Sequence, residues 1–214
     1  SGNPQITFFK VVYRRHTNFS IEVIEHPLTN AGLNRRSSVT VLRNGDLATK
    51  MYLKATITTS VSDPDQKWAF VRKLGHALIK NVELEIGGSK IDKQYGVWMD
   101  IWYELSHEVG QEDGYNKMVG NTPLMTTKAA GNANRGDNNG FVVYIPLQFY
   151  FCRNTGLALP LIALQYHEVR VHFEFNSSSE LVRYEVNNTR GFTSSPVTVT
   201  LSDASLLVDY VFLD

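Results

Sequence analysis

Short segments in which apolar and polar residues alternate recur along almost the whole chain. Two of the clearest are FSIEVI at residues 19–24 and VRVHFEF at residues 169–175. A period of two places successive side chains on opposite faces of a β-strand, so each segment has one face to bury. Polar turns separate the segments, and strands do not alternate regularly with helices. The pattern therefore predicts an antiparallel β-sandwich.

The alternation predicts roughly eight to ten strands. We expect them at residues 7–14, 19–24, 38–43, 47–60, 82–86, 89–92, 141–152, 169–175, 197–201 and 205–213. Asn44 and Gly45 separate the third of these segments from the fourth. Because both residues tolerate the positive φ angles of a type I′ turn, the sequence predicts a hairpin there. Gly87 and Gly88 predict a second reversal, between residues 82–86 and 89–92.

A first helical insert is expected at residues 63–75. Asp63-Pro64 suits a helix start, since Asp caps free N–H groups and Pro fits the first helical position. Trp68, Val71 and Leu74 then follow at helical spacing. Trp68 is therefore expected to anchor the core.

A second helix is predicted by Trp98, Ile101, Trp102 and Leu105, which lie at positions i, i+3, i+4 and i+7 and so share one face. We expect that face to contact the core, although the two tryptophans could instead stack on a sugar. The expected core anchors are Trp68, Trp98, Ile101, Trp102, Leu105 and Phe149.

The composition changes at residues 106–140, which are rich in Gly, Asn, Asp and Lys and contain few large apolar residues. A loop of this length in a compact domain is usually functional or disordered. We interpret it as a long loop between strands.

Charge and cysteine content exclude some classes of protein. Lys+Arg and Asp+Glu both number 21, so the formal net charge is zero. Nucleic-acid binding usually needs a basic surplus, so direct binding of nucleic acid is not expected. Cys152 is the sole cysteine, which rules out a scaffold held by internal disulfides. No stretch approaches the 18 or so apolar residues of a membrane-spanning helix.

Three arrangements could carry chemistry, and each has a structural alternative that we favour. Glu83 and Glu85 share a strand face and could act in acid–base catalysis, but Lys90 or Lys93 across the Gly-Gly turn would pair with them in a solvated face. Cys152 ends an apolar strand, and cysteine is among the most buried residue types, so packing is favoured over nucleophilic catalysis.

His167, Glu168 and His172 are the best candidates for metal binding. Some jelly-roll enzymes, the cupins, bind a metal through a His-x-His pair and a Glu. In this chain the two histidines are five positions apart, so a regular strand directs them to opposite faces. A metal site needs three or four convergent ligands, and we therefore expect no metal site and no cofactor.

Two further kinds of candidate site are pairs of adjacent arginines and motifs for N-linked glycosylation. Arg14-Arg15 and Arg35-Arg36 are expected in ion pairs between subunits or in solvated turns, with a position facing a membrane left open for Arg35-Arg36. The N-x-S/T motif occurs at Asn18, Asn176 and Asn187. Asn176 and Asn187 lie in a polar segment and are the reachable candidates for glycosylation.

Several longer motifs resemble one known family. They are GNPQITFFKVVYRRHTNF at residues 2–19, NVELEIGGSKIDKQY at 81–95, GLALPLIALQYHEV at 156–169 after IPLQFYF, and the closing LLVDYVFLD. In this order they resemble the major capsid proteins of large icosahedral nucleocytoplasmic DNA viruses. The resemblance implies two tandem jelly rolls, each of two four-stranded sheets, in trimers that tile a shell over an internal membrane.

The resemblance therefore implies that residues 1–214 form a single jelly-roll domain, the first of the two. The expected fold is an all-β, eight-stranded antiparallel jelly-roll sandwich with two short helical inserts and a long inter-strand loop. The chain is either part of a longer protein or an unusual single-roll form. Asn132, Asn134, Arg135 and Asn138 are the candidates for the outer surface.

The function implied is structural and not enzymatic. The expected partners are other copies of the chain in a homotrimer, neighbouring capsomers, minor capsid proteins and the internal viral membrane. The expected location is the virion, after assembly in the host cytoplasm, where the glycosylation motifs would stay unmodified. Two alternatives are a carbohydrate-binding attachment module that uses residues 106–140 and a cupin-like metalloenzyme.

Overall fold

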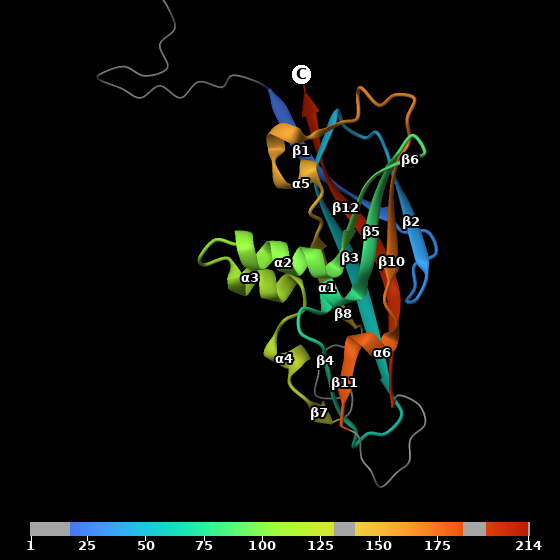
Figure 1. Cartoon of the computed structure of the whole chain (residues 1–214), viewed down its shortest axis with the longest axis vertical. Helices are drawn as coiled ribbons and strands as arrows, with labels where there is room; N and C mark the ends of the chain where they lie inside the picture. The colour runs from blue at the N-terminus through green and yellow to red at the C-terminus, as the bar shows by residue number, and fades with distance from the viewer. Residues whose placement is uncertain (1–17, 131–139, 186–195, 214) are drawn as a thin grey trace, which may run out of the picture.

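The computed structural model describes residues 18–130, 140–185 and 196–213, which form mainly two antiparallel β-sheets packed face to face (Figure 1). The first sheet has the order β1-β12-β3-β8, with β9 paired to β3. Its strands are β1 (Phe19–Pro27), β12 (Val197–Leu213), β3 (Leu47–Val61), β8 (Phe141–Pro146) and β9 (Leu159–Pro160). The second sheet has the order β2-β10-β5-β6. Its strands are β2 (Arg36–Val41), β10 (Val169–Phe175), β5 (Ile79–Ile86) and β6 (Ser89–Tyr95).

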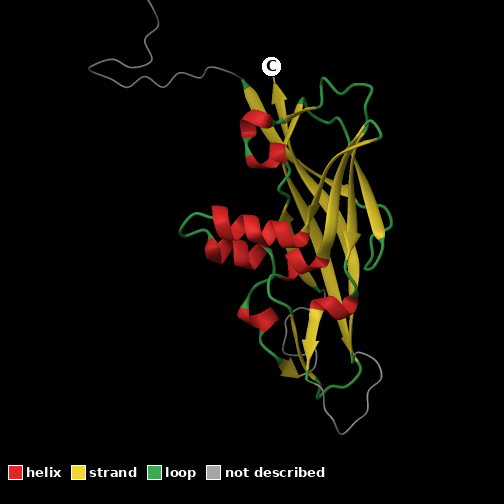
Figure 2. Cartoon of the chain, in the orientation of Figure 1, coloured by secondary structure: helices red, strands yellow, loops and turns green. Residues whose placement is uncertain are grey.

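Smaller elements connect the strands. A third sheet has the order β11-β4-β7, with strands β11 (Val182–Tyr184), β4 (Lys67–Phe70) and β7 (Ala129–Ala130). The helical segments are α1 (Leu74–Leu78), α2 (Gly96–Ser106), α3 (Glu112–Met118), α4 (Pro123–Thr126), α5 (Tyr150–Arg153), α6 (Ser178–Leu181) and the 3-10 turn η1 (Thr155–Leu157). Figure 2 shows most of them on one side of the sandwich, the left in this view.

The core lies between the two main sheets and follows from the alternation in the sequence. Leu53, Ala55 and Ile57 of β3 are fully buried and alternate with half-buried residues. Val171 and Phe173 of β10 face them from the second sheet and are also fully buried. Complete burial of a side chain of this size stabilises the fold by about 1.5–3 kcal/mol. The prediction of an antiparallel β-sandwich is therefore confirmed.

The hairpin expected at Asn44-Gly45 does not form. β2 pairs with β10 and β3 pairs with β12, so the chain passes from one sheet to the other at this turn. Neither Asn44 nor Gly45 has a positive φ. A Cβ at Gly45 would lie 3.0 Å from the Cβ of Tyr210, so close packing against β12 explains this glycine. The Gly87-Gly88 reversal is confirmed, with φ values of 57° and 81°.

The prediction of a helix at residues 63–75 is also wrong. Residues 67–70 form β4 between β11 and β7, and α1 begins at Leu74, after Lys73 with its φ of 51°. Pairing with two distant strands overrides the helical spacing. Trp68 is fully buried all the same, with its ring edge-to-face against Phe70 at 5.1 Å.

Two expectations about loops and strand ends need correction. The described part of residues 106–140 contains α3, α4 and β7 rather than a long loop, because Val119 and Met125 anchor this segment in the core. With α1 to α6, the helical content of the described residues exceeds the two inserts expected. The strand expected at 141–152 ends at Pro146, and Phe149 is fully buried just before α5.

Helix α2 has the expected position but the opposite orientation. Its buried residues are Gly96, Met99 and Tyr103. Trp98, Ile101 and Leu105, expected as core anchors, are exposed, and Trp102 is half-buried. The stripe of large apolar side chains therefore points away from the sandwich.

Contacts with α1 and α3 fix this orientation. A Cβ at Gly96 would lie 2.1 Å from the carbonyl oxygen of His76 and 2.3 Å from that of Ile79, so α2 begins in direct contact with the backbone of α1 and β5. The ring of Tyr103 stacks on Tyr115 of α3, with the centroids 3.8 Å apart. Lys73 forms ion pairs with Asp100 and Glu104 of α2.

His76 is buried at the centre of these contacts. Its side chain is 5% exposed, and its Nε2 shares a hydrogen bond of 2.7 Å with the hydroxyl of Tyr115. Its Nδ1 lies 3.6 Å from Oδ1 of Asp100, too far for a good hydrogen bond. Burial lowers the pKa of His76 to about 4.

Replacing Gly96 by alanine should destabilise the protein by at least about 3 kcal/mol, because the new Cβ meets backbone atoms that cannot move aside. Gly114→Ala in α3 is the matched control, since open space surrounds that position. It should leave stability unchanged or raise it by up to about 1 kcal/mol. Urea denaturation of both variants tests this, and equal stabilities would contradict the close contact.

The protein should lose stability on mild acidification. The folded-state pKa of His76, about 4, lies below the 6.5 of a free histidine, so the unfolded chain binds the proton first and stability falls as the pH drops from 7 toward 4. His76 alone should account for about 2 kcal/mol between pH 7 and pH 5. Burial also lowers the pKa of His26, which acts in the same direction.

Urea denaturation at pH 7 and pH 5 measures this dependence. The variant His76→Gln removes the titrating group, so its loss between the two pH values should be smaller than that of the wild type, whatever its stability at pH 7. An unchanged dependence on pH would show that His76 is not the responsible group.

Candidate assembly surfaces

The exposed apolar residues of α2 form a first candidate surface. Val97 is 71% exposed, Trp98 36%, Ile101 46% and Leu105 78%, and we call these four residues the α2 stripe. Beside them the guanidinium of Arg153, in α5, lies 4.8 Å from the ring centroid of Trp102. The contacts of Gly96 and Tyr103 fix the orientation of α2. The α2 stripe is therefore held on the outside of the protein.

A second apolar surface lies on the outer face of the first sheet. Phe19 of β1 is 53% exposed, Ile21 59% and Val23 55%, and Leu213 of β12 is 52% exposed. The register places Phe19 opposite Leu213 and Ile21 opposite Val211. We call these five residues the β1/β12 strip. Figure 1 shows β1, α5 and α2 toward the same side of the molecule.

The outer face of the second sheet has the opposite character, because ion pairs and hydrogen bonds cross it. Glu83 is the centre, with a side chain that is 6% exposed. It accepts hydrogen bonds from Arg36 at 3.0 Å and Lys90 at 3.1 Å, and Lys93 lies 3.0 Å away. The hydrogen bond from Lys93 is the main cause that lowers the pKa of Glu83 to about 2. Lys90 and Lys93 thus pair with Glu83 as expected; the carboxylate itself is buried, whereas Lys90 and Arg36 are more than half exposed.

The same face contains a second set of polar pairs. Glu174 accepts hydrogen bonds from Lys80 at 2.7 Å and from Asn81 at 2.6 Å. His172 shares a hydrogen bond of 3.1 Å with Glu85. Charges on this face therefore compensate one another within the chain.

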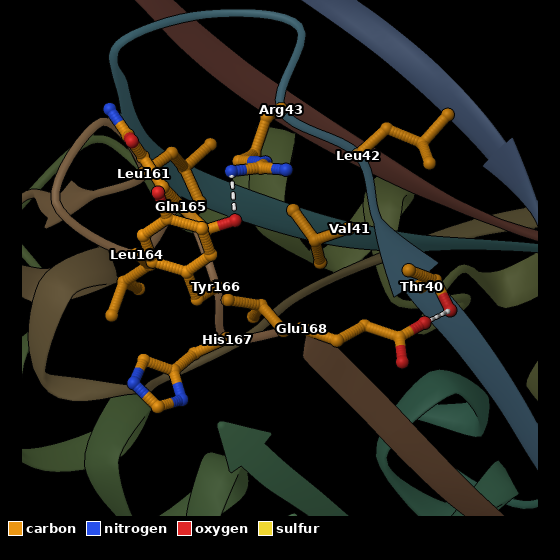
Figure 3. Close-up of a pocket in the computed structure, with 11 residues that line it drawn as sticks. Thr40, Val41, Leu42, Arg43, Leu161, Leu164, Gln165, Tyr166, His167 and Glu168 are labelled. Atoms are coloured by element: carbon orange, nitrogen blue, oxygen red, sulfur yellow. Dashed lines mark hydrogen bonds between the residues drawn. The ribbon is translucent and has the colours of Figure 1, made fainter. Parts of the chain in front are cut away.

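A hollow of about 310 Å³ opens at one end of the sandwich, between the end of β2 and the segment before β10 (Figure 3). Arg43 donates a hydrogen bond of 2.5 Å to the carbonyl of Gln165. Thr40 donates one of 3.1 Å to Glu168. Both bonds join one side of the hollow to the other, so they hold this end of the sandwich together.

The residues weighed for chemistry do not converge. Glu168 pairs with Arg170 at 2.5 Å, whereas His172 pairs with Glu85 on β5. Within residues 18–130, 140–185 and 196–213, no group of three His, Cys, Asp or Glu side chains could hold a metal ion. Burial raises the pKa of Cys152 to about 12, so its thiol is not activated as a nucleophile.

Some candidates fall outside the described residues, namely Arg14, Arg15, Asn132, Asn134, Arg135, Asn138 and Asn187. Asn176 is described, and its side-chain amide donates a hydrogen bond of 2.8 Å to the carbonyl of Ala77. Asn176 is half-buried, and its glycosylation stays a prediction. No helix of the described segments has the length and apolar character needed to span a membrane.

Sequence reasoning missed two of these features. The alternation located β1. Because Phe19, Ile21 and Val23 are two positions apart, it also predicts that they share one face of the strand. It does not say whether that face is buried in the core or exposed on the outside of the sheet. The role of Tyr115 against His76 and Tyr103 gave no local signal, because it depends on how α1, α2 and α3 meet.

Comparison with known proteins identifies the family. Residues 7–214 match the family described as "Major capsid protein N-terminus". The chain is 48% identical to the major capsid protein of Pyramimonas orientalis virus, in a match covering 100% of this chain and 49% of the relative. It is 45% identical to capsid protein 1 of Acanthamoeba polyphaga mimivirus, over 100% of this chain and 37% of that protein. The chain thus spans half the length, or less, of these curated relatives.

Solved structures agree. A chain of the PBCV-1 virus capsid superposes with a TM-score of 0.69 and 33% identity, over 97% of this chain and 46% of that chain. The Faustovirus major capsid protein has a TM-score of 0.73 at 11% identity, over 98% and 57%, which is a likeness of fold alone. The chain therefore belongs to the major capsid protein family of large DNA viruses and corresponds to the N-terminal part of its members.

Proposed function

We propose that this chain is a structural, non-enzymatic part of the shell of an icosahedral virus, and that it acts by self-assembly. Its place would be the capsid of the virion, after assembly in the host cytoplasm. Membership of the capsid protein family supports the role in the shell. The exposed α2 stripe is the observation that supports self-assembly, because another subunit could cover it. Covering a half-exposed apolar side chain of this size is worth roughly 1 kcal/mol, about half the value for full burial.

The proposed domain is one eight-stranded jelly roll over residues 1–214. The two main sheets contain eight strands apart from the short β9, and these can be numbered one to eight in chain order as β1, β2, β3, β5, β6, β8, β10 and β12. In this numbering the strand orders of the two sheets are 1-8-3-6 and 2-7-4-5. The pairs 1 with 8, 2 with 7, 3 with 6 and 4 with 5 are nested. Such nesting supports the proposal, because a jelly roll is a long antiparallel ribbon folded over into two sheets.

The proposed assembly is a homotrimer that presents a hexagonal outline and meets neighbouring capsomers in the shell. A contact between two different patches on one subunit closes into a ring when the rotation allows it. The α2 stripe supports such a contact, since it is apolar, exposed and rigidly held. Minor capsid proteins and an internal viral membrane are further proposed neighbours, as the family resemblance implies.

Charge placed on the α2 stripe should prevent assembly without unfolding the chain. We expect the double variant Ile101→Glu, Leu105→Glu to keep the far-UV circular dichroism of the wild type, since Ile101 is 46% and Leu105 78% exposed. Light scattering on the chain extended past Asp214 should give the mass of a trimer for the wild type. For the variant it should give that of a monomer, with association weakened at least tenfold.

Ser89→Glu is the matched control, because it adds the same kind of charge to an exposed position of β6 on the other sheet. It should still form trimers. A trimer from the double variant would rule out the stripe as a subunit contact, and a wild type that stays monomeric at every concentration would contradict the proposed assembly.

A further inference from the structure

The turn that joins β2 to β3 contains the pair Asn44-Gly45, and packing fixes the glycine of this pair. A Cβ at Gly45 would lie 3.0 Å from the Cβ of Tyr210 and 3.2 Å from the carbonyl oxygen of Val211. Tyr210 does not move aside easily, because it is fully buried and its hydroxyl donates a hydrogen bond of 2.7 Å to the carbonyl of Leu42. Close packing of this kind penalises an added methyl group. Position 45 therefore favours glycine, whatever residue precedes it.

Asn44 is not held in this way. It is exposed, and its side-chain amide has no hydrogen-bond partner among the residues that the structure describes. The N–H of Gly45 likewise has no acceptor in the described part of the chain, whereas the next N–H, that of Asp46, donates to the carbonyl of Val211 at 3.0 Å. Both residues precede the first paired residue of β3, Leu47. Hydrogen bonding within the described residues therefore protects neither the amide of Asn44 nor the backbone nitrogen of Gly45.

We propose that Asn44 is a site of spontaneous deamidation, a covalent modification that consumes only water. The backbone nitrogen of Gly45 forms a bond to the side-chain carbonyl carbon of Asn44. The amide nitrogen of Asn44 leaves as ammonia with the proton of the attacking nitrogen, and a cyclic succinimide remains. Water then adds to one of the two ring carbonyls and breaks its bond to the nitrogen, which leaves aspartate or isoaspartate at position 44. Glycine favours the first step, because it has no Cβ to crowd the attacking nitrogen.

Both products disturb the contacts that close the hollow at this end of the sandwich. Arg43, the neighbour of Asn44, donates its hydrogen bond of 2.5 Å to the carbonyl of Gln165 across the hollow (Figure 3). A new carboxylate at position 44 competes for that guanidinium, because a hydrogen bond between two charged groups is stronger than one to a neutral carbonyl. Deamidation therefore weakens the link between Arg43 and the segment before β10.

Isoaspartate has the larger effect, since it adds one carbon atom to the backbone between Arg43 and Gly45. Just beyond this point, the carbonyl of Asp46 accepts a hydrogen bond of 3.1 Å from the N–H of Ile162, and its carboxylate accepts one of 2.7 Å from the N–H of Leu213. The lengthened turn must displace either Arg43 or Asp46 from its partners. The segment that contains Ile162 should then open more often.

Peptide mapping by mass spectrometry tests the modification. The folded chain is incubated at mildly alkaline pH, and the fraction deamidated at each asparagine is followed with time. We expect Asn44 to react at least tenfold faster than Asn30, the matched control in the same molecule, which is also exposed but is followed by Ala31. The sequence has a second Asn-Gly pair at residues 139–140, whose asparagine lies outside the described residues. The peptide map separates the two sites.

The variant Asn44→Gln keeps the amide but lengthens the side chain by one carbon, which disfavours ring closure, so it should abolish the reaction at this position. Hydrogen exchange then measures the consequence for the hollow. In aged wild-type protein enriched in isoaspartate, peptides that cover residues 160–168 should exchange at least threefold faster than in fresh protein. Peptides from the buried strand β10 should exchange at the same rate in both, and aged Asn44→Gln should match the fresh protein.

Two results would overturn the proposal. Deamidation of Asn44 no faster than that of Asn30 would mean that the turn holds the pair in a geometry that prevents ring closure. Unchanged exchange of residues 160–168 in the isoaspartate form would contradict the effect on the hollow. Neither measurement depends on assembly of the chain, so this proposal and the proposed function fail separately.

Discussion

The antiparallel pairing of β3 with β12 is the interaction on which the rest of the fold depends. It runs from Val61 opposite Val197 to Leu47 opposite Val211, with two register shifts. β1 adds to the far side of β12, and β8 and β9 add to the far side of β3. The paired residues are more than 130 positions apart in the chain, so the first sheet requires closure of a very long loop. Folding dominated by such contacts is slow.

A second constraint is the packing of α2 against α1, β5 and α3. Gly96 and Tyr103 dock α2 on its neighbours, and His76 is buried uncharged beneath it. The position of α2 is thus determined by backbone contact and ring stacking, while its most apolar side chains remain outside. The outer faces of the two sheets also differ, with compensated charges across the second sheet and exposed apolar residues along β1 and the end of β12 in the first.

Much of this architecture could be predicted from local patterns, because alternation reports which face of a strand is buried. That argument located β1, β3, β10 and β12. It failed at Asn44-Gly45 and at Trp68, where the pairing partners are distant strands and outweigh a local turn or helix signal. Helical spacing correctly grouped Trp98, Ile101 and Leu105 on one face, but periodicity does not say what that face contacts. On the surface, the ion pairs of Glu83 with Lys90 and Lys93 could be predicted, because all three residues belong to one hairpin. The ion pair of Glu83 with Arg36 could not, because Arg36 comes from a distant part of the chain.

The pairing of β1 with β12 also has a consequence for synthesis on the ribosome. β1 is made well before β12, its ladder partner among the described residues. At about 5–20 residues per second, roughly 10–40 s pass before that partner is complete. During this interval Phe19, Ile21 and Val23 belong to an unpaired apolar segment of a nascent chain. Copies of this chain that are synthesised at the same time expose the segment together, which makes it a site of aggregation between nascent chains.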